Sequence, residues 1–248
     1  MTIADLAAHF PALDSQTPVL IAGPTACGKS RLALQIAKTF GGVVINADAI
    51  QVYGALQIVT ARPSMEDERQ VQHLLYGHIT FDHAYSVGQW LREVTPLLHG
   101  GERPIIIGGT GLYFQALTQG LAEIPQISPQ IIARSEQVLA NAGHTALITE
   151  LDAATAARID LHNPMRVQRA WQVLHSTGRG LADWQDATPP PMLRVADSIP
   201  IVFNVARDWL NQRIATRFES MVTDGAVDEI HALLSVWSPH LPCAKAIG

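Results

Sequence analysis

Residues 23–30 of this 248-residue chain read Gly-Pro-Thr-Ala-Cys-Gly-Lys-Ser, and their types and spacing suit the binding of a phosphate chain. Gly23 and Gly28 permit backbone angles that let the loop turn its N–H groups inward around an anion. Lys29 supplies a mobile positive charge for a phosphate oxygen, and the Ser30 hydroxyl can bind Mg²⁺. The pattern predicts a di- or triphosphate site formed by Gly23, Pro24, Thr25, Ala26, Cys27, Gly28, Lys29 and Ser30.

A strand and a helix must hold this loop in place. An apolar run at 18–22 precedes it, and residues 29–39 follow with apolar side chains at helical spacing. The start of that helix would add the positive end of its dipole to the phosphate site. Further apolar runs at 43–46, 104–107 and 199–205 are continuous rather than alternating, which indicates parallel strands buried on both faces. We therefore expect an α/β fold, a P-loop NTPase-like parallel sheet with helices on both faces.

Polar residues follow two of these strands. Asp48 lies just past the run at 43–46, and Thr110 follows the run at 104–107 in a Gly-Gly-Thr-Gly turn. Ligands of parallel sheets bind at the carboxyl ends of the strands, so both should face the phosphate loop. Asp48 could act as a general base, serve a Mg²⁺ ion or cap a helix at 49–53. Thr110 could donate to a leaving-group oxygen or only stabilise its turn.

The run at 104–107 ends in glycines and carries no Asp of the kind that holds Mg²⁺ in motor-type NTPases. This weakens an ATPase or GTPase interpretation. The loop could instead hold a leaving pyrophosphate and stabilise the charge that develops as a carbon–oxygen bond breaks.

Residues 121–197 show helical patterns and no strand, which predicts an all-helical insertion into a core domain of residues 1–120 and 198–248. Within the insertion, Arg166 and Arg169 are three residues apart and share a helix face. A solvated face is the ordinary interpretation of such a pair, and an anion-binding face is the alternative.

A second row of arginines, Arg207, Arg213 and Arg217, follows the last strand. Its start just past a strand end favours an anion-facing role for Arg207 and Arg213. The net charge of −5 argues weakly against a nucleic-acid partner. The absence of an apolar run of about 18 residues, of a secretory signal pattern and of a cysteine framework favours a cytoplasmic protein with no membrane span.

Six segments occur in an order that is specific to one family. They are 23–30, Asn46–Tyr53, Thr60–Pro63, His73–Tyr76, Gly108–Tyr113 and Asn163–Ala170. Together they resemble the tRNA dimethylallyltransferase family, also called tRNA isopentenyltransferases, over residues 18–248. Cys27 and Ala49 stand where the family commonly has serine. Residues 243–248 resemble the start of a family segment that continues into further helices, which predicts a truncated C-terminus.

The resemblance implies transfer of a dimethylallyl group from dimethylallyl diphosphate to the exocyclic amine of the adenosine 3′ of the anticodon, in tRNAs reading codons that begin with U. Lys29 and Ser30 would hold the diphosphate with Mg²⁺, and Asp48 would be the base for the amine. Thr110 would lie near the reacting centre, into which the adenosine is extruded. Asp48, Thr110 and Lys29 form the expected catalytic set.

The resemblance also implies the residues that contact the tRNA anticodon loop. They are Asp48, Ala49, Ile50, Gln51 and Thr110 in the core, and Met165, Arg166, Val167, Gln168 and Arg169 in the insertion. We expect a monomer. Three alternatives stay open: a small-molecule P-loop kinase, a nucleotide-dependent switch without turnover, and a relative that prenylates free AMP or ATP.

Overall fold

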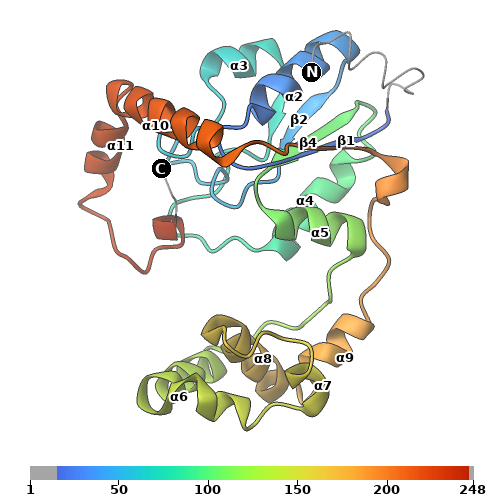
Figure 1. The fold of residues 1–248 in the computed structure, drawn as a ribbon, viewed down its shortest axis with the longest axis vertical. Coiled ribbons are helices and arrows are strands. Elements are labelled where there is room, and N and C mark those ends of the chain that lie inside the picture. The colour runs from blue at the N-terminus through green and yellow to red at the C-terminus, as the bar shows by residue number, and fades with distance from the viewer. Residues whose placement is uncertain (1–15, 246–248) are drawn as a thin grey trace. The chain divides into compact units, whose positions relative to one another are not determined.

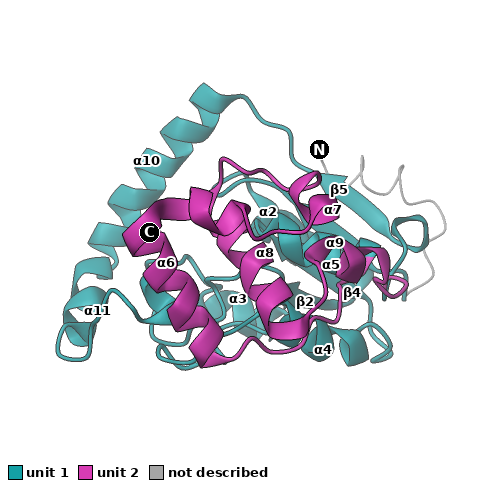
Figure 2. Ribbon diagram, turned by 90° about the horizontal axis from the view of Figure 1, so that it is seen from below, with its two compact units in different colours: residues 1–119, 192–248 teal, residues 120–191 magenta. Residues whose placement is uncertain are grey.

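The computed structural model describes residues 16–245 and divides the chain into two units (Figures 1 and 2). The larger unit comprises residues 1–119 and 192–248, and the smaller unit comprises residues 120–191. The predicted core domain extends over residues 1–15 and 246–248, which lie outside the described residues. No helix within residues 16–245 combines the length and apolarity needed to cross a membrane.

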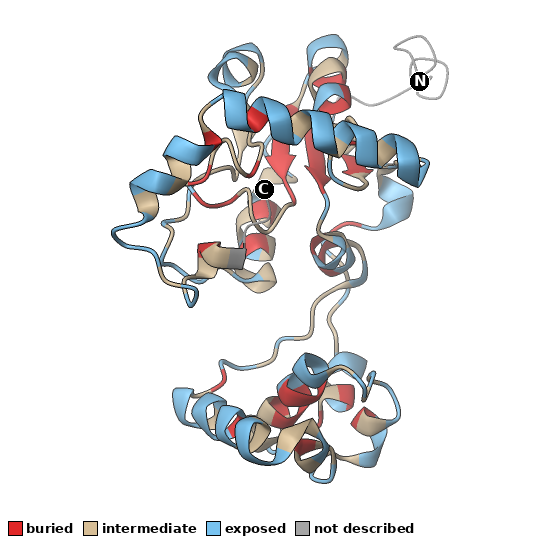
Figure 3. Cartoon of the chain, turned by 60° about the vertical axis from the view of Figure 1, so that its left-hand side comes forward, coloured by how far each residue is buried: buried red, intermediate tan, exposed pale blue. Residues whose placement is uncertain are grey.

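The larger unit is built on a five-stranded parallel sheet, which confirms the predicted fold class. The strands lie in the order β3-β2-β4-β1-β5. Their bounds are β1 Val19–Ala22, β2 Val43–Asn46, β3 His73–Leu74, β4 Pro104–Gly108 and β5 Ile199–Val202. Strands β2 and β4 are buried along their whole length, and β1 along all but its last residue, as Figure 3 shows for the sheet. Burial on both faces explains why their sequences are apolar without alternation.

Alternate residues of the central strands face two different helical layers. On one face, Ile21 and Ile107 pack with Leu32, Ala33 and Ile36 of helix α2 (Lys29–Phe40). The other face packs against helices α4 (Val87–Leu97) and α5 (Gly111–Gln119). Figure 1 shows α2 and the α4–α5 pair on opposite sides of the sheet.

The second face is anchored by two aromatic side chains. The Trp90 ring of α4 stacks on Tyr113 of α5 with centroids 4.6 Å apart, and both rings are buried. The indole N–H of Trp90 donates to the carbonyl of Asn46, 2.6 Å away, at the end of β2. This packing fixes the strand end that leads to Asp48.

Three further helices complete the larger unit. They are α3 (Met65–Gln70), α10 (Arg207–Thr223) and α11 (Ala226–Leu233), with short 3-10 turns at Val195–Asp197 and Pro242–Lys245. Helix α11 packs through Ile230 and Leu233 on a small cluster that contains Val52, Tyr53 and Leu56. Helix α11 thereby packs against the segment that follows Asp48.

The smaller unit consists of helices α6 (Pro129–Ile148), α7 (Ala153–Ala156), α8 (Pro164–Thr177) and α9 (Leu181–Asp186). Asn163 caps the start of α8 by accepting from the N–H groups of Met165 and Arg166, and Gly178 ends that helix in a left-handed conformation. Leu147 of α6 and Val167 and Trp171 of α8 form its core.

One predicted boundary differs. Residues 192–197 group with the larger unit rather than with the insertion. The reason is local: the Leu193 N–H donates to the Leu117 carbonyl at 3.2 Å, and the Leu193 side chain packs in the core beside α5. An apolar side chain at the end of a Pro-rich linker ties the returning chain to the sheet domain.

Candidate active site

The phosphate loop connects β1 to α2, and its glycines are needed for different reasons. Gly28 directly precedes α2 with a φ of 102°, in the left-handed region that favours glycine. Gly23 is limited by space instead, because a Cβ there would lie 2.7 Å from the Cβ of Phe203. The loop conformation therefore depends on both positions that define the motif.

Lys29 lies over the loop with its ammonium group directed at main-chain oxygens. Its Nζ donates to the carbonyls of Gly23 at 2.8 Å and Pro24 at 2.6 Å, and lies 3.9 Å from Cys27 Sγ. Burial lowers the pKa of Lys29, while the nearby Cys27 and Asp48 act in the opposite direction. A cation with reduced hydration attracts a phosphate oxygen more strongly than one in bulk water.

Asp48 is positioned by the fully buried Asn46. The Asn46 amide donates to the carbonyls of Asp48 and Leu75, both at 3.0 Å, and its oxygen accepts from the Asp48 N–H at 2.9 Å. Asp48 Oδ1 accepts from the Ile50 N–H at 3.0 Å. Residues 49–52 form a bend and a turn, and Tyr53 forms an isolated bridge with Ile79, so the alternative that Asp48 caps a helix there is wrong.

Thr110 joins the ends of β2 and β4. Its Oγ1 accepts from the Ala49 N–H at 3.0 Å, which leaves the hydroxyl proton available for another acceptor. The strands approach closely here, because a Cβ on Gly108 would lie 2.0 Å from the Ala47 carbonyl oxygen. Thr110 therefore makes a turn-stabilising contact, and its hydroxyl proton has no acceptor among residues 16–245.

A cavity of about 770 Å³ lies at this edge of the sheet, a volume within the range of small-molecule sites. Its lining includes the predicted residues Pro24, Thr25, Ala26, Cys27, Gly28, Lys29, Ser30, Asp48, Ile50, Gln51, Thr110 and Arg213. It also includes Arg31, Thr60, Ala61, Ile107, Gly108, Gly109, Ile214, Arg217, Phe218 and Met221, which were not predicted. Gly23, Ala49 and Arg207 lie outside the described lining, although Gly23 and Ala49 contact Lys29 and Thr110 through their backbones.

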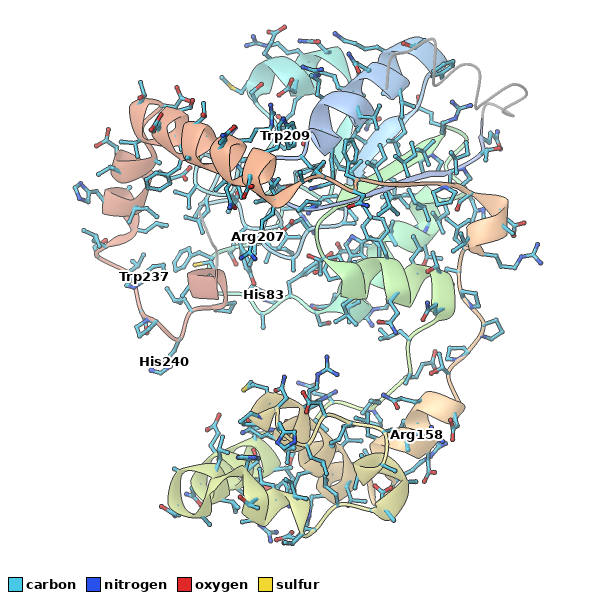
Figure 4. All side chains as sticks on the ribbon, in the orientation of Figure 1. His83, Arg158, Arg207, Trp209, Trp237 and His240 are labelled. Carbon is cyan, nitrogen blue, oxygen red and sulfur yellow. The ribbon has the colours of Figure 1, made fainter. Side chains whose placement is uncertain are left out.

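The arginines of α10 divide into two groups. Arg213 Nε donates to the Ala26 carbonyl at 2.8 Å, and Arg217 Nη2 donates to Thr25 Oγ1 at 2.6 Å, so both reach the phosphate loop. Arg207, labelled in Figure 4 at the start of the helix, is exposed and does not line the cavity. Arg217 belongs to the same row of arginines in the sequence, although it is not among the predicted site residues. Its spacing of four from Arg213 was the signal that could have included it.

The predicted RNA-contacting segment of the smaller unit has two faces. Met165 is 70% exposed, and Arg166 and Arg169 are also exposed. Val167 is fully buried, and the Gln168 amide donates to Ser135 Oγ at 3.0 Å in the interior. The Val167 and Gln168 side chains therefore pack inside the helical unit, and the contact of residues 165–169 with tRNA stays a prediction.

The donor set of the cavity suits a magnesium ion carried by a diphosphate. The described residues hold no cluster of three or more His, Cys, Asp and Glu side chains that could form a protein-only metal site. The Ser30 hydroxyl and the Asp48 carboxylate do line the same cavity. Mg²⁺ commonly takes one or two protein oxygens, with phosphate and water oxygens completing its shell.

Comparison with known proteins identifies the family. The family model described as IPP transferase matches residues 51–248, and one described as isopentenyl transferase matches residues 17–78. A tRNA dimethylallyltransferase of Cereibacter sphaeroides is 54% identical over 239 residues, which cover 96% of this chain and 76% of that protein. The enzyme of that name from Paracoccus denitrificans is 53% identical, with 95% and 80% coverage.

Solved structures agree with this assignment. The tRNA isopentenylpyrophosphate transferase of Bacillus halodurans has a TM-score of 0.61 at 29% identity, covering 93% of this chain and 74% of its own. A eukaryotic dimethylallyltransferase acting on tRNA shares the fold with a TM-score of 0.76 at 24% identity, covering 90% and 57%. The phosphate loop, the paired strand ends and these relatives together show that the chain belongs to the tRNA dimethylallyltransferase, or isopentenyltransferase, family.

Proposed function

We propose that the protein transfers a dimethylallyl group from dimethylallyl diphosphate to the exocyclic amine of the adenosine 3′ of the anticodon, in tRNAs that read codons beginning with U. The observation that carries the proposal is the convergence of the phosphate loop, Asp48 and Thr110 on one cavity at the carboxyl ends of three adjacent strands. Membership of the family supplies the reaction class.

The phosphate loop binds the diphosphate. Its N–H groups and the start of α2 meet the phosphate oxygens, and Lys29 exchanges its carbonyl contacts for them. Arg213 and Arg217 extend this positive wall from α10. Ser30 would hold Mg²⁺, which supplies positive charge to the diphosphate when bound.

Asp48 and Thr110 serve the transfer itself. The amine nitrogen of adenosine forms a bond to the carbon of the dimethylallyl group that carries the diphosphate. The bond between that carbon and the diphosphate oxygen breaks, and one amine proton is transferred to Asp48. Thr110 donates its hydroxyl proton as a hydrogen bond to the oxygen on which negative charge develops. The products are the prenylated adenosine, diphosphate and one proton.

The enzyme is a monomer in the cytoplasm, and its partner is the tRNA. Asp48, Ile50 and Gln51 line the cavity that would receive the extruded adenosine. Met165, Arg166 and Arg169 present an exposed, positively charged face of α8 to the anticodon loop. Splayed bases and phosphates of an unpaired loop suit these side chains.

A direct assay separates this function from its alternatives. The protein is incubated with unmodified tRNA, dimethylallyl diphosphate and Mg²⁺, and the digested nucleosides are analysed by mass. We expect dimethylallyl-adenosine from tRNA and none from free AMP supplied in its place. ADP formation from ATP and small acceptors, without a prenylated nucleoside, would instead indicate a kinase, which family membership does not favour.

A further inference from the structure

The carboxylate of Glu229, on α11, lies in a turn formed by residues 57–59. Glu229 Oε1 accepts from the N–H groups of Gln57 at 2.7 Å and Ile58 at 2.9 Å. Oε2 accepts from Ile58 at 3.1 Å and Val59 at 2.9 Å. Hydrogen bonds to an ionised acceptor are roughly twice as strong as neutral ones. One carboxylate thus gathers three consecutive main-chain donors.

The same turn leads directly into the cavity wall. Thr60 and Ala61 follow Val59, and both line the cavity. Ala61 has a φ of 52°, a left-handed conformation that a side chain disfavours, so its surroundings must hold it. The Thr60 hydroxyl also donates to the Leu56 carbonyl, and this hydrogen bond links the two ends of the turn.

Thr60 and Ala61, which form this part of the cavity wall, hold the Gln51 side chain in place. The Gln51 amide nitrogen donates to the carbonyls of Thr60 at 2.8 Å and Ala61 at 2.9 Å. With both amide protons engaged, the side-chain oxygen is the group that remains for a ligand. Gln51 lines the cavity beside Asp48, whereas Glu229 does not line it. Glu229 therefore reaches the ligand only through the turn and Gln51.

We propose that Glu229 is a positioning residue for the nucleotide side of the cavity. Its carboxylate holds residues 57–61 so that the Thr60 and Ala61 carbonyls orient Gln51 toward the substrate base. The phosphate loop is not part of this chain of contacts, so diphosphate binding is independent of it. The idea that the adenine base lies beside residues 60–61 and Gln51 rests on the proposed function. The effect of Glu229 on the conformation of residues 57–61 does not.

The variant Glu229→Gln tests the positioning directly. The new amide NH₂ group faces a main-chain N–H, so at least one of the three donors loses its acceptor. Asp228→Asn is the matched control, because it removes the same charge from the exposed neighbour in the same helical turn. Hydrogen exchange of a peptide covering residues 55–62 should be about tenfold faster or more in Glu229→Gln and unchanged in Asp228→Asn.

Ligand measurements then separate positioning from general destabilisation. We expect the KM for tRNA to rise about tenfold in Glu229→Gln, while the affinity for inorganic pyrophosphate with Mg²⁺ stays within twofold of wild type. Glu229→Asp, which is one methylene shorter, should restore the charge without restoring the KM. Unchanged exchange would overturn the proposal.

Faster exchange with unchanged tRNA kinetics would also overturn it, and so would equal losses of tRNA and pyrophosphate binding. If the wild-type protein does not prenylate tRNA, the proposed function fails. The exchange result would still decide whether Glu229 holds the turn.

Discussion

Replacing Asp48 by asparagine separates the charge of this carboxylate from its structural hydrogen bond. The amide oxygen of Asn can still accept from the Ile50 N–H, which Asp48 Oδ1 does at 3.0 Å, and the Asn46 contacts use only the Asp48 backbone. The local backbone should therefore stay in place. What disappears is the ability to take a proton from the substrate amine.

The size of the effect follows from the role. A positioned general base contributes roughly 10²- to 10⁴-fold to a rate, so Asp48→Asn should lower kcat for tRNA prenylation by about that factor. Single-turnover transfer of radiolabelled dimethylallyl groups, at saturating diphosphate, measures it. Pyrophosphate affinity should change much less, because the phosphate loop is intact.

Two results would refute this reasoning. A loss of less than tenfold would mean that Asp48 is not the base. An equal loss of Mg²⁺-dependent pyrophosphate affinity and of kcat would assign the carboxylate to the metal instead.

Three further outcomes follow from the geometry. Arg217→Ala should weaken pyrophosphate binding, measured by calorimetry, about tenfold or more, since the charged Arg217 side chain donates to the phosphate loop. Arg207→Ala is the control and should leave pyrophosphate binding unchanged. A larger loss in Arg207→Ala than in Arg217→Ala would contradict the placement of Arg217 at the diphosphate. The double variant Arg166→Ala with Arg169→Ala should weaken tRNA binding and lower its salt slope by about 2, and an unchanged slope would make that face merely solvated. Trp171→Ala, at a fully buried position, should destabilise the smaller unit by about 3–5 kcal/mol in denaturant unfolding, and a loss below 1 kcal/mol would contradict the described packing.

The sheet and its loop could be predicted because their signals are local. The continuous apolar runs give parallel strands, and the glycine spacing of the phosphate loop follows from φ at Gly28 and from close packing at Gly23. Asp48 and Thr110 could be paired because parallel strands end at the same edge.

Side-chain direction was harder to predict. Arg217, and not Arg207, reaches the phosphate loop because of the direction in which α10 crosses that loop. The spacing of the arginines in the sequence does not give this direction. Val167 could have been recognised as buried, since Val167, Ala170 and Trp171 have the spacing of one apolar helix face.

Glu229 lay beyond sequence reasoning for a different reason. Its partners are Gln57, Ile58 and Val59, and the separation from Gln57 is 172 residues. The donors are main-chain N–H groups, which all residue types except proline carry. Residue types at 57–59 therefore give no signal of the contact, and only the position of α11 against the turn reveals it.

Mapping the modified position within tRNA shows whether the protein has the proposed reaction and specificity. Unmodified tRNA that reads a codon beginning with U is treated with the protein, dimethylallyl diphosphate and Mg²⁺, and its nuclease fragments are sequenced by mass. We expect one dimethylallyl group on the adenosine 3′ of the anticodon, and none when guanosine replaces that adenosine. A group on another nucleotide, or transfer that persists with guanosine, would contradict this expectation.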